Sequence, residues 1–318
     1  MSVQFIAPLQ RSWDRSRGIL LRPFDLQAWL TIGFTAWLAR LWDGSIFGGD
    51  GAVNFDIGGD DSRWGGLGGG AVERVIDALE NPLGLLVGLM LLGVFLVIGA
   101  ALAWVSSRGA FMLFDNVAHR RSRVSEPWER LGQLGDSLFV WRVATQLLAG
   151  LVAFALAIPL LVVVLPMSHA EGFLAGLSLA LVAPIGAVGL LLGLLIAFVG
   201  FCTDQFVVPL MHRYDEGVLP AWERFLPLLR REPLAFVLMA VFYLLLAVVV
   251  GVAVATAGAM TCCALFVVLS IPYIGTVLLL PVYLTARAFG PEFLAQFGDE
   301  FTTWPTEVFE ALEPGDET

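Results

Sequence analysis

The chain has 318 residues, of which 58% are hydrophobic and only 14% are charged, against about 25% charged residues in soluble domains. Its net charge is -10, and every one of its 18 basic residues is arginine. A water-soluble fold of this length would have to hide more apolar surface than its volume allows, so the composition excludes an ordinary soluble domain and predicts an integral membrane protein. The three cysteines have neither a disulfide framework nor a metal-ligand spacing.

Six apolar segments follow a basic N-terminal arm, residues 1–22. A membrane-spanning helix requires about 18 to 20 apolar residues, and the sequence predicts spans at 24–42, 82–107, 139–165, 173–201, 234–257 and 264–286. The predicted fold is therefore all-α, with residues 1–286 forming one transmembrane domain of six helices arranged as three hairpins. Residues 287–318 are predicted to form a cytoplasmic tail that begins amphipathic and ends acidic.

Residues 43–70, between the first two predicted spans, are rich in glycine and aspartate and show no periodicity. We interpret this stretch as a flexible, solvated outer loop. Carboxylates separated by glycines also suit a hard cation such as Ca²⁺, so cation binding is the alternative interpretation.

Two basic, tryptophan-bearing elbows, residues 108–131 and 204–225, connect predicted spans. Similar sequences surround Trp29 (PFDLQAWLTIGF), Trp128 (EPWERLGQL) and Trp222 (LPAWERFLPLL), at spacings of 99 and 94 residues. This similarity predicts an internal three-fold repeat, in which a short interfacial helix precedes each span that starts from the elbow side. The three tryptophans are predicted to anchor these helices at the membrane interface.

Arginine is concentrated on one side of the predicted bundle. Fourteen of the 18 arginines lie in the N-terminal arm, the first elbow, the second elbow with the residues that follow it up to 231, and the tail. Because cytoplasmic loops collect arginine, both termini and both elbows are predicted to face the cytoplasm, and the protein is predicted to be a multi-pass protein of the cytoplasmic (inner) membrane.

Arginines in the elbows are candidates for contact with lipid-headgroup phosphates. The candidates are Arg120, Arg121, Arg130, Arg213 and Arg224. Orientation alone also requires basic cytoplasmic loops, so we favour the simpler interpretation that these arginines set the topology without binding a specific ligand.

At these elbows the chain resembles a family of uncharacterised prokaryotic integral membrane proteins. The family is distantly similar to the membrane domain attached to some glycerophosphodiester phosphodiesterases. The similar residues are PFDLQAWLTIGFTAWLARL, the WER elbows and the ending IGTVLLLPVYLTARAFGPEFLAQFG. The resemblance implies a six-helix membrane domain without an established activity, and it supplies no enzymatic residues, because nothing in the chain matches the phosphodiesterase catalytic barrel.

Ionisable residues close to membrane depth are further functional candidates. Asp204 and Arg287, each near the end of a predicted span, are the candidates for a polar pathway. His119 and His212 occupy matching places in the two elbows. Metal binding would require these histidines to converge with carboxylates, and we interpret them instead as part of a solvated basic cluster. The sequence predicts no catalytic residue, cofactor or metal site.

Three functions remain open. The first is a non-enzymatic scaffold or lipid-interacting factor, with membrane lipids, further copies of the chain or other membrane proteins as partners and no role for nucleic acid. The second is a small-molecule or lipid transporter, which a cavity lined by Asp204 or Arg287 would favour. The third, a membrane-embedded enzyme of lipid metabolism, would require carboxylates or histidines that converge on one cavity.

Overall fold

The structure is a computed structural model that describes residues 3–21, 24–41, 81–119, 125–167 and 173–304, with the side chains of 160–181 excepted. The described residues form helices and connecting turns, and no β-strand occurs among them. Four of the helices are long and apolar enough to cross a membrane, and a bent pair of shorter helices raises the number to five. The predicted all-α class is thus confirmed.

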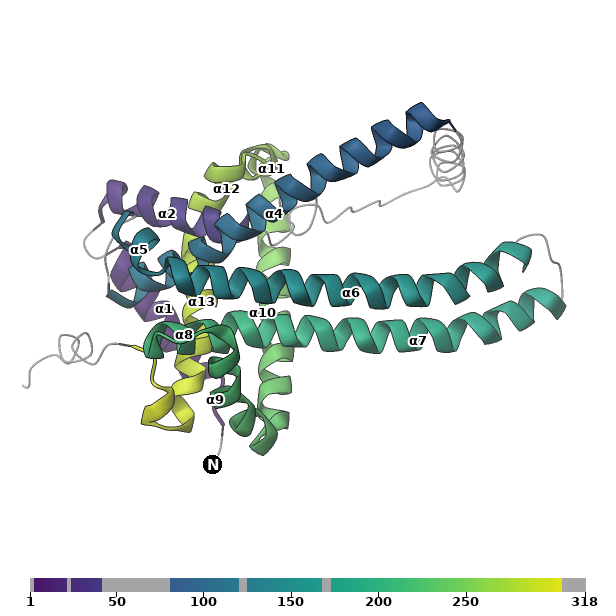
Figure 1. Cartoon of the computed structure of the whole chain (residues 1–318). Helices are drawn as coiled ribbons and strands as arrows, with labels where there is room; N and C mark the ends of the chain where they lie inside the picture. The colour runs from purple at the N-terminus through teal and green to yellow at the C-terminus, as the bar shows by residue number, and fades with distance from the viewer. Residues whose placement is uncertain (1–2, 22–23, 42–80, 120–124, 168–172, 305–318) are drawn as a thin grey trace, which may run out of the picture.

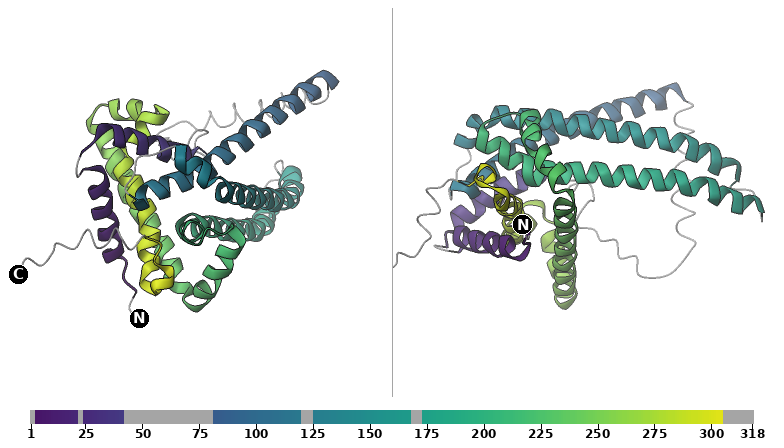
Figure 2. Two further views of the ribbon diagram at one scale, coloured as in Figure 1. Left: turned by 60° about the vertical axis from the view of Figure 1, so that its left-hand side comes forward. Right: turned by 90° about the horizontal axis from the view of Figure 1, so that it is seen from below.

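The four long helices are α4 (Pro82–His119), α6 (Gly132–Met167), α7 (Phe173–Cys202) and α10 (Pro233–Met260). Their apolar parts face outward: Leu91 of α4 is 65% exposed, which in a membrane protein is the surface that lipid tails cover. Helices α6 and α7 lie side by side along most of their length (Figures 1 and 2). Helix α10 runs across the direction of α6 and α7 in both figures, so it extends from the core in a different direction.

Shorter helices complete the fold. They are α1 (Ile6–Leu20), α2 (Leu26–Arg40), α5 (Ser125–Arg130), the π-helix η1 (Thr203–Val207), α8 (Val208–Tyr214), α9 (Val218–Arg231), α11 (Ala264–Leu269), α12 (Pro272–Leu278), α13 (Leu280–Leu294) and the single 3₁₀ turns η2 (Ala295–Phe297) and η3 (Asp299–Phe301). Helices α5 and α9 precede the long helices α6 and α10, in the places where the sequence predicts interfacial helices.

The first and last predicted spans differ from the expectation. Helix α2 has 15 residues, fewer than the roughly 20 that cross a bilayer. The segment predicted at 264–286 is divided into α11, α12 and α13, and α12 meets the helix over 280–297 at 68°. Pro272 and Pro281 stand in the first turns of α12 and α13, where a missing backbone N–H costs no helical hydrogen bond. The loop predicted at 43–70 lies outside the described residues.

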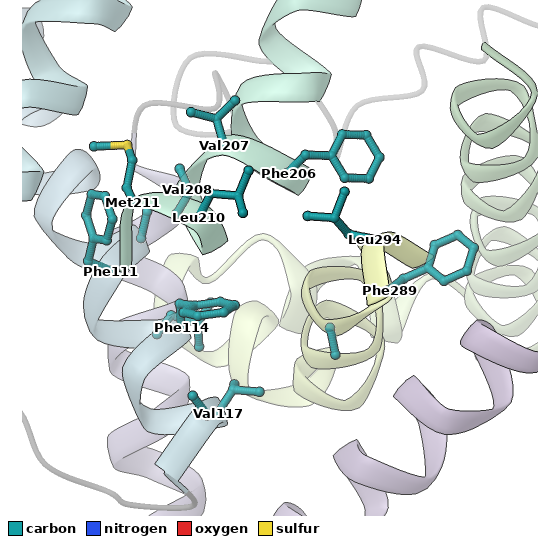
Figure 3. Packing of buried hydrophobic residues seen from close by; sticks show 14 of the residues in the cluster. Phe111, Phe114, Val117, Phe206, Val207, Val208, Leu210, Met211, Phe289 and Leu294 are labelled. Atoms are coloured by element: carbon teal, nitrogen blue, oxygen red, sulfur yellow. The ribbon is translucent and has the colours of Figure 1, made fainter. Parts of the chain in front are cut away.

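Aromatic and aliphatic side chains from the elbows form the core together with α13 (Figure 3). Phe111 and Phe114 from the last turns of α4, Phe206 from η1 and Phe289 from α13 are fully buried. The boundary predicted at residue 286 falls inside α13, and residues 288–294, predicted to begin a tail, are all buried in this core. Helix α4 likewise continues 12 residues beyond its predicted end at 107, because its last turns face the core rather than lipid.

The two ends of the described chain pack against the elbows. Helix α1 lies along α13, and Arg15 of α1 donates to Glu292 of α13 at 3.0 Å. Trp304, beyond α13, stacks on Phe114 with ring centroids 5.3 Å apart. The Tyr214 hydroxyl at the end of α8 donates to the carbonyl oxygen of Glu300 at 2.8 Å. The core therefore joins α1, both elbows and the segment that follows α13.

Candidate functional site

Four polar side chains meet at the end of α4, and we call them the Asp115 cluster: Asp115, His119, Arg130 and His212. The buried Asp115 carboxylate lies at the centre. Its Oδ1 is 3.0 Å from His212 Nε2 and 3.2 Å from His119 Nδ1, and Arg130 Nη2 donates to the same oxygen. His119 Nδ1 is also 3.2 Å from the carbonyl oxygen of Asp115.

Local structure explains why these residues meet. Asp115 and His119 are separated by four residues on α4, so both lie on the same face of the helix. Helix α8 brings His212 in from the second elbow, and the His212 ring packs edge-on against Phe114 at 5.1 Å. Arg130 ends α5 in the first elbow. The cluster thus joins the two elbows that the sequence identifies.

A cavity of about 490 Å³, here called the histidine cavity, opens beside the Asp115 cluster. Its lining residues are His119, Arg130, Leu131, His212, Arg213, Asp215, Thr303 and Trp304. Two further polar groups in this lining, Thr303 Oγ1 and Trp304 Nε1, are buried and have no hydrogen-bond partner among the described residues.

A second cavity of about 200 Å³, here called the arginine cavity, lies between α2, α4, α6, η1 and α13. Its charged lining residues are Arg40, Arg142, Asp204 and Arg287. Arg142 Nη2 donates to Asp204 Oδ1 at 2.7 Å, and Arg142 Nη1 donates to Ser106 Oγ at 3.3 Å. The structure therefore brings together Asp204 and Arg287, the two residues predicted to form a polar pathway, and adds Arg142 and Arg40.

A close helix contact holds this cavity in place. Asp204 and Gln205 belong to the π-helix η1, which packs on α13 at Gly290. A Cβ atom at Gly290 would lie 2.2 Å from the carbonyl oxygen of Gln205. Only glycine permits this approach, because a backbone atom cannot turn aside as a side chain can. Single π-turns inside helices frequently mark functional sites.

The candidate headgroup arginines fall into three groups. Arg120 and Arg121 lie outside the described residues. Arg130 bonds to Asp115, and Arg224 makes a two-fold hydrogen bond to Glu216 at 2.7 and 2.9 Å. Arg213 is exposed and has no carboxylate partner within the described part of the chain.

The hydrogen bonds from Arg224 hold the pKa of Glu216 below its ordinary value, with the positive charge of the guanidinium acting in the same direction. Arg224 is thus already engaged by a carboxylate, whereas Arg213 has its charge available at the mouth of the histidine cavity.

The three candidate anchor tryptophans pack against protein groups. Trp29 Nε1 donates to the carbonyl oxygen of Val277 at 3.1 Å. Trp128 lies edge-on against Trp104 at 5.9 Å, and Trp222 packs against Trp141 at 5.9 Å. Each ring therefore contributes to helix packing, and interfacial anchoring stays a prediction.

Sequence reasoning missed two features of the site. His119 and His212 were interpreted as solvated, but the His212 side chain is only 10% exposed, and both rings contact a buried carboxylate. The signal was the spacing of four residues between Asp115 and His119 on one helix. The buried pair of Arg15 and Glu292 had no local signal, because 277 residues separate its members.

Comparison with known proteins gives a family and no activity. The model of a family of unknown function, DUF7544, matches residues 4–297. No curated protein and no solved structure matches the chain. The match bears out the resemblance to an uncharacterised family and shows no link to glycerophosphodiester phosphodiesterases.

Proposed function

The chain belongs to the DUF7544 family of unknown function, and from its geometry we propose that it is a multi-pass, non-enzymatic membrane protein that binds an anionic lipid headgroup in the arginine cavity. The single observation that carries this proposal is the charge of the lining: three guanidinium groups and one carboxylate converge on one cavity among apolar helices. An anion gains most from positive charge where surrounding apolar groups keep water away.

The size of the arginine cavity limits how large a ligand group can bind in it. A volume of about 200 Å³ lies below the roughly 300–1,000 Å³ of pockets that enclose drug-sized molecules. It suits one phosphate or carboxylate group rather than a whole lipid. The exposed apolar faces beside it, such as that of α4, suit the tails of the same lipid.

Packing of the core supports six crossings. If α4, α6, α7 and α10 each cross, the elbows lie on one side of the membrane, whereas the beginning of α4 and the end of α10 lie on the other. Trp304, in the segment after α13, stacks on Phe114 of the first elbow, and Arg15 of α1 lies over the Trp304 ring. The proposal then requires one crossing before α4 and one after α10. Among the described residues, the segments available for them are α2, which is shorter than a usual span, and the bent α12–α13 pair.

The arginine distribution supports a cytoplasmic location for the elbow side, and with it for both termini. Reporter fusions test this topology. A fusion after residue 60 should report the outside, and fusions after Glu216 and Trp304 should report the cytoplasm. A cytoplasmic signal from residue 60 would contradict the proposed crossing by α2.

Native mass spectrometry tests the ligand. Protein from nanodiscs of mixed phosphatidylglycerol and phosphatidylcholine should retain phosphatidylglycerol, and the Arg287→Gln variant should lose it. Arg213→Gln is the matched control, since Arg213 lies outside the arginine cavity, and it should retain the lipid. Loss in R213Q but not in R287Q would assign binding to the elbow surface and contradict the proposal.

A transporter is the second candidate, because the arginine cavity lies beside a broken crossing, the 68° bend between α12 and α13, and broken helices build transporter sites. An efflux assay with proteoliposomes that are loaded with inorganic phosphate distinguishes a transporter from a headgroup-binding protein. Phosphate efflux that R287Q abolishes, without lipid retention in the wild type, would favour transport and overturn the headgroup proposal.

A further inference from the structure

The Asp115 cluster presents three ligand atoms of the kinds that bind transition metals. One carboxylate oxygen and two imidazole nitrogens, from Asp115, His119 and His212, lie within 4.8 Å of one another. The contacts from the carboxylate oxygen to the two nitrogens are 3.0 and 3.2 Å. Ligands of a tetrahedral ion with bonds of about 2.0–2.2 Å stand roughly 3.4 Å apart, so these contacts are close to the required spacing.

The ligand types decide which ion fits. Mg²⁺ and Ca²⁺ take oxygen ligands, whereas imidazole suits zinc and its first-row neighbours. Two imidazoles and one carboxylate leave the fourth position of a tetrahedral ion open, as in zinc sites that bind water or substrate. His119 Nδ1 would act as a ligand in the tautomer that carries its proton on Nε2.

The histidine cavity provides space for a fourth ligand of the metal ion. Both histidines line it, so the proposed site borders a space of about 490 Å³ from which a fourth ligand can approach. The buried Thr303 Oγ1 and Trp304 Nε1, which have no hydrogen-bond partner among the described residues, lie in the same lining.

Arg130 marks the competing interpretation, in which the Asp115 cluster is only an ion-pair network. The guanidinium donates to the same Oδ1 that a metal ion would use. Its side chain is 52% exposed, so it can turn towards solvent at little cost when an ion arrives. A metal ion and Arg130 would therefore compete for Asp115.

We propose that Asp115, His119 and His212 form a binding site for one divalent transition-metal ion, for which Zn²⁺ has the best-matched chemistry. The site joins the two elbows, since its ligands come from α4 and α8. Bound metal would link these helices in addition to the aromatic packing of Phe114 and His212.

Titration of the purified full-length protein with Zn²⁺ against a chromophoric chelator tests the site, with an affinity tag free of histidine. The wild type should bind one equivalent. His119→Gln and His212→Gln should each weaken binding by more than about 100-fold, beyond the roughly 10–100-fold that the loss of an outer-shell partner costs. His169→Gln is the matched control, because His169 is the remaining histidine of the chain, and it should bind as the wild type does.

Arg130→Gln separates the two interpretations most sharply. Removal of the competing cation should tighten Zn²⁺ binding several-fold. Helical circular dichroism and gel filtration establish that each variant folds, and the half-buried position of His119 at the end of α4, 29% exposed, makes H119Q the safest variant in this respect. Absence of a saturable one-to-one site in the wild type, or equal weakening by H169Q, would overturn the proposal.

Discussion

Glu292 is the carboxylate on which the N-terminal helix depends. It is 2% exposed, Arg15 donates to it at 3.0 Å, and Arg11 lies 3.7 Å away. Glu292→Gln removes the negative charge that compensates the buried Arg15 guanidinium. Loss of one member of a buried ion pair costs about 3–5 kcal/mol, so the thermal unfolding midpoint in detergent should fall by several degrees.

Arg11→Gln provides the matched control, because Arg11 is half exposed and contacts the same carboxylate from its solvent side. An exposed ion pair contributes about 0–1 kcal/mol, and the midpoint of R11Q should stay close to that of the wild type. Equal losses in both variants would mean that the burial of Arg15 is not the source of the effect.

Among the elements, η1 and α13 make the closest contact that bears on the arginine cavity. Gly290→Ala would place a Cβ atom 2.2 Å from the carbonyl oxygen of Gln205, and the helices must separate to accommodate it. Overpacking of this kind costs about 1–3 kcal/mol. The unfolding midpoint should fall, and retention of phosphatidylglycerol should weaken, since Asp204 moves with η1.

Gly251→Ala is the control at this scale, because no atom lies within 4 Å of the position that its Cβ would take in α10. Alanine is favoured over glycine inside a helix by about 1 kcal/mol, so G251A should unfold at the same or a slightly higher temperature. A fall in G251A as large as that in G290A would contradict the assigned contact.

On the surface of the whole molecule, an exposed leucine faces either lipid or water. Leu194 of α7 and Leu219 of α9 are 59% and 62% exposed, but only Leu194 lies within a candidate membrane span. Leu194→Arg should lower the membrane-inserted fraction after alkaline extraction, because arginine in the apolar centre costs about 2.5–3.5 kcal/mol. Leu219→Arg should insert normally, and equal behaviour of the two variants would contradict the proposed spans.

Helix α10 adds a constraint at the same scale. Membrane helices tilt by no more than about 40° from the bilayer normal, whereas α10 runs across the α6–α7 pair (Figure 2). A crossing of one flat bilayer by α6, α7 and α10 therefore requires α10 to stand at a different angle to the α6–α7 pair.

Hydropathy predicted the long helices because each consists of a continuous run of apolar residues, which the sequence of that segment alone reveals. Pro272 and Pro281, which stand at the beginnings of α12 and α13, are local signals of the same kind. The π-turn at Asp204 and the length of α2 depend on packing against other helices, and no local pattern encodes them. Asp204 and Arg287 were predicted singly, but their shared cavity arises from tertiary contacts.

The pairing of Arg15 with Glu292 has a consequence for biogenesis. The two residues are 277 positions apart, and ribosomes add about 5–20 residues per second. Arg15 therefore leaves the ribosome tens of seconds before its carboxylate partner exists, and α1 has no groove to occupy until α13 emerges. Until then the early chain lacks this contact, and the core closes only after α13 has emerged.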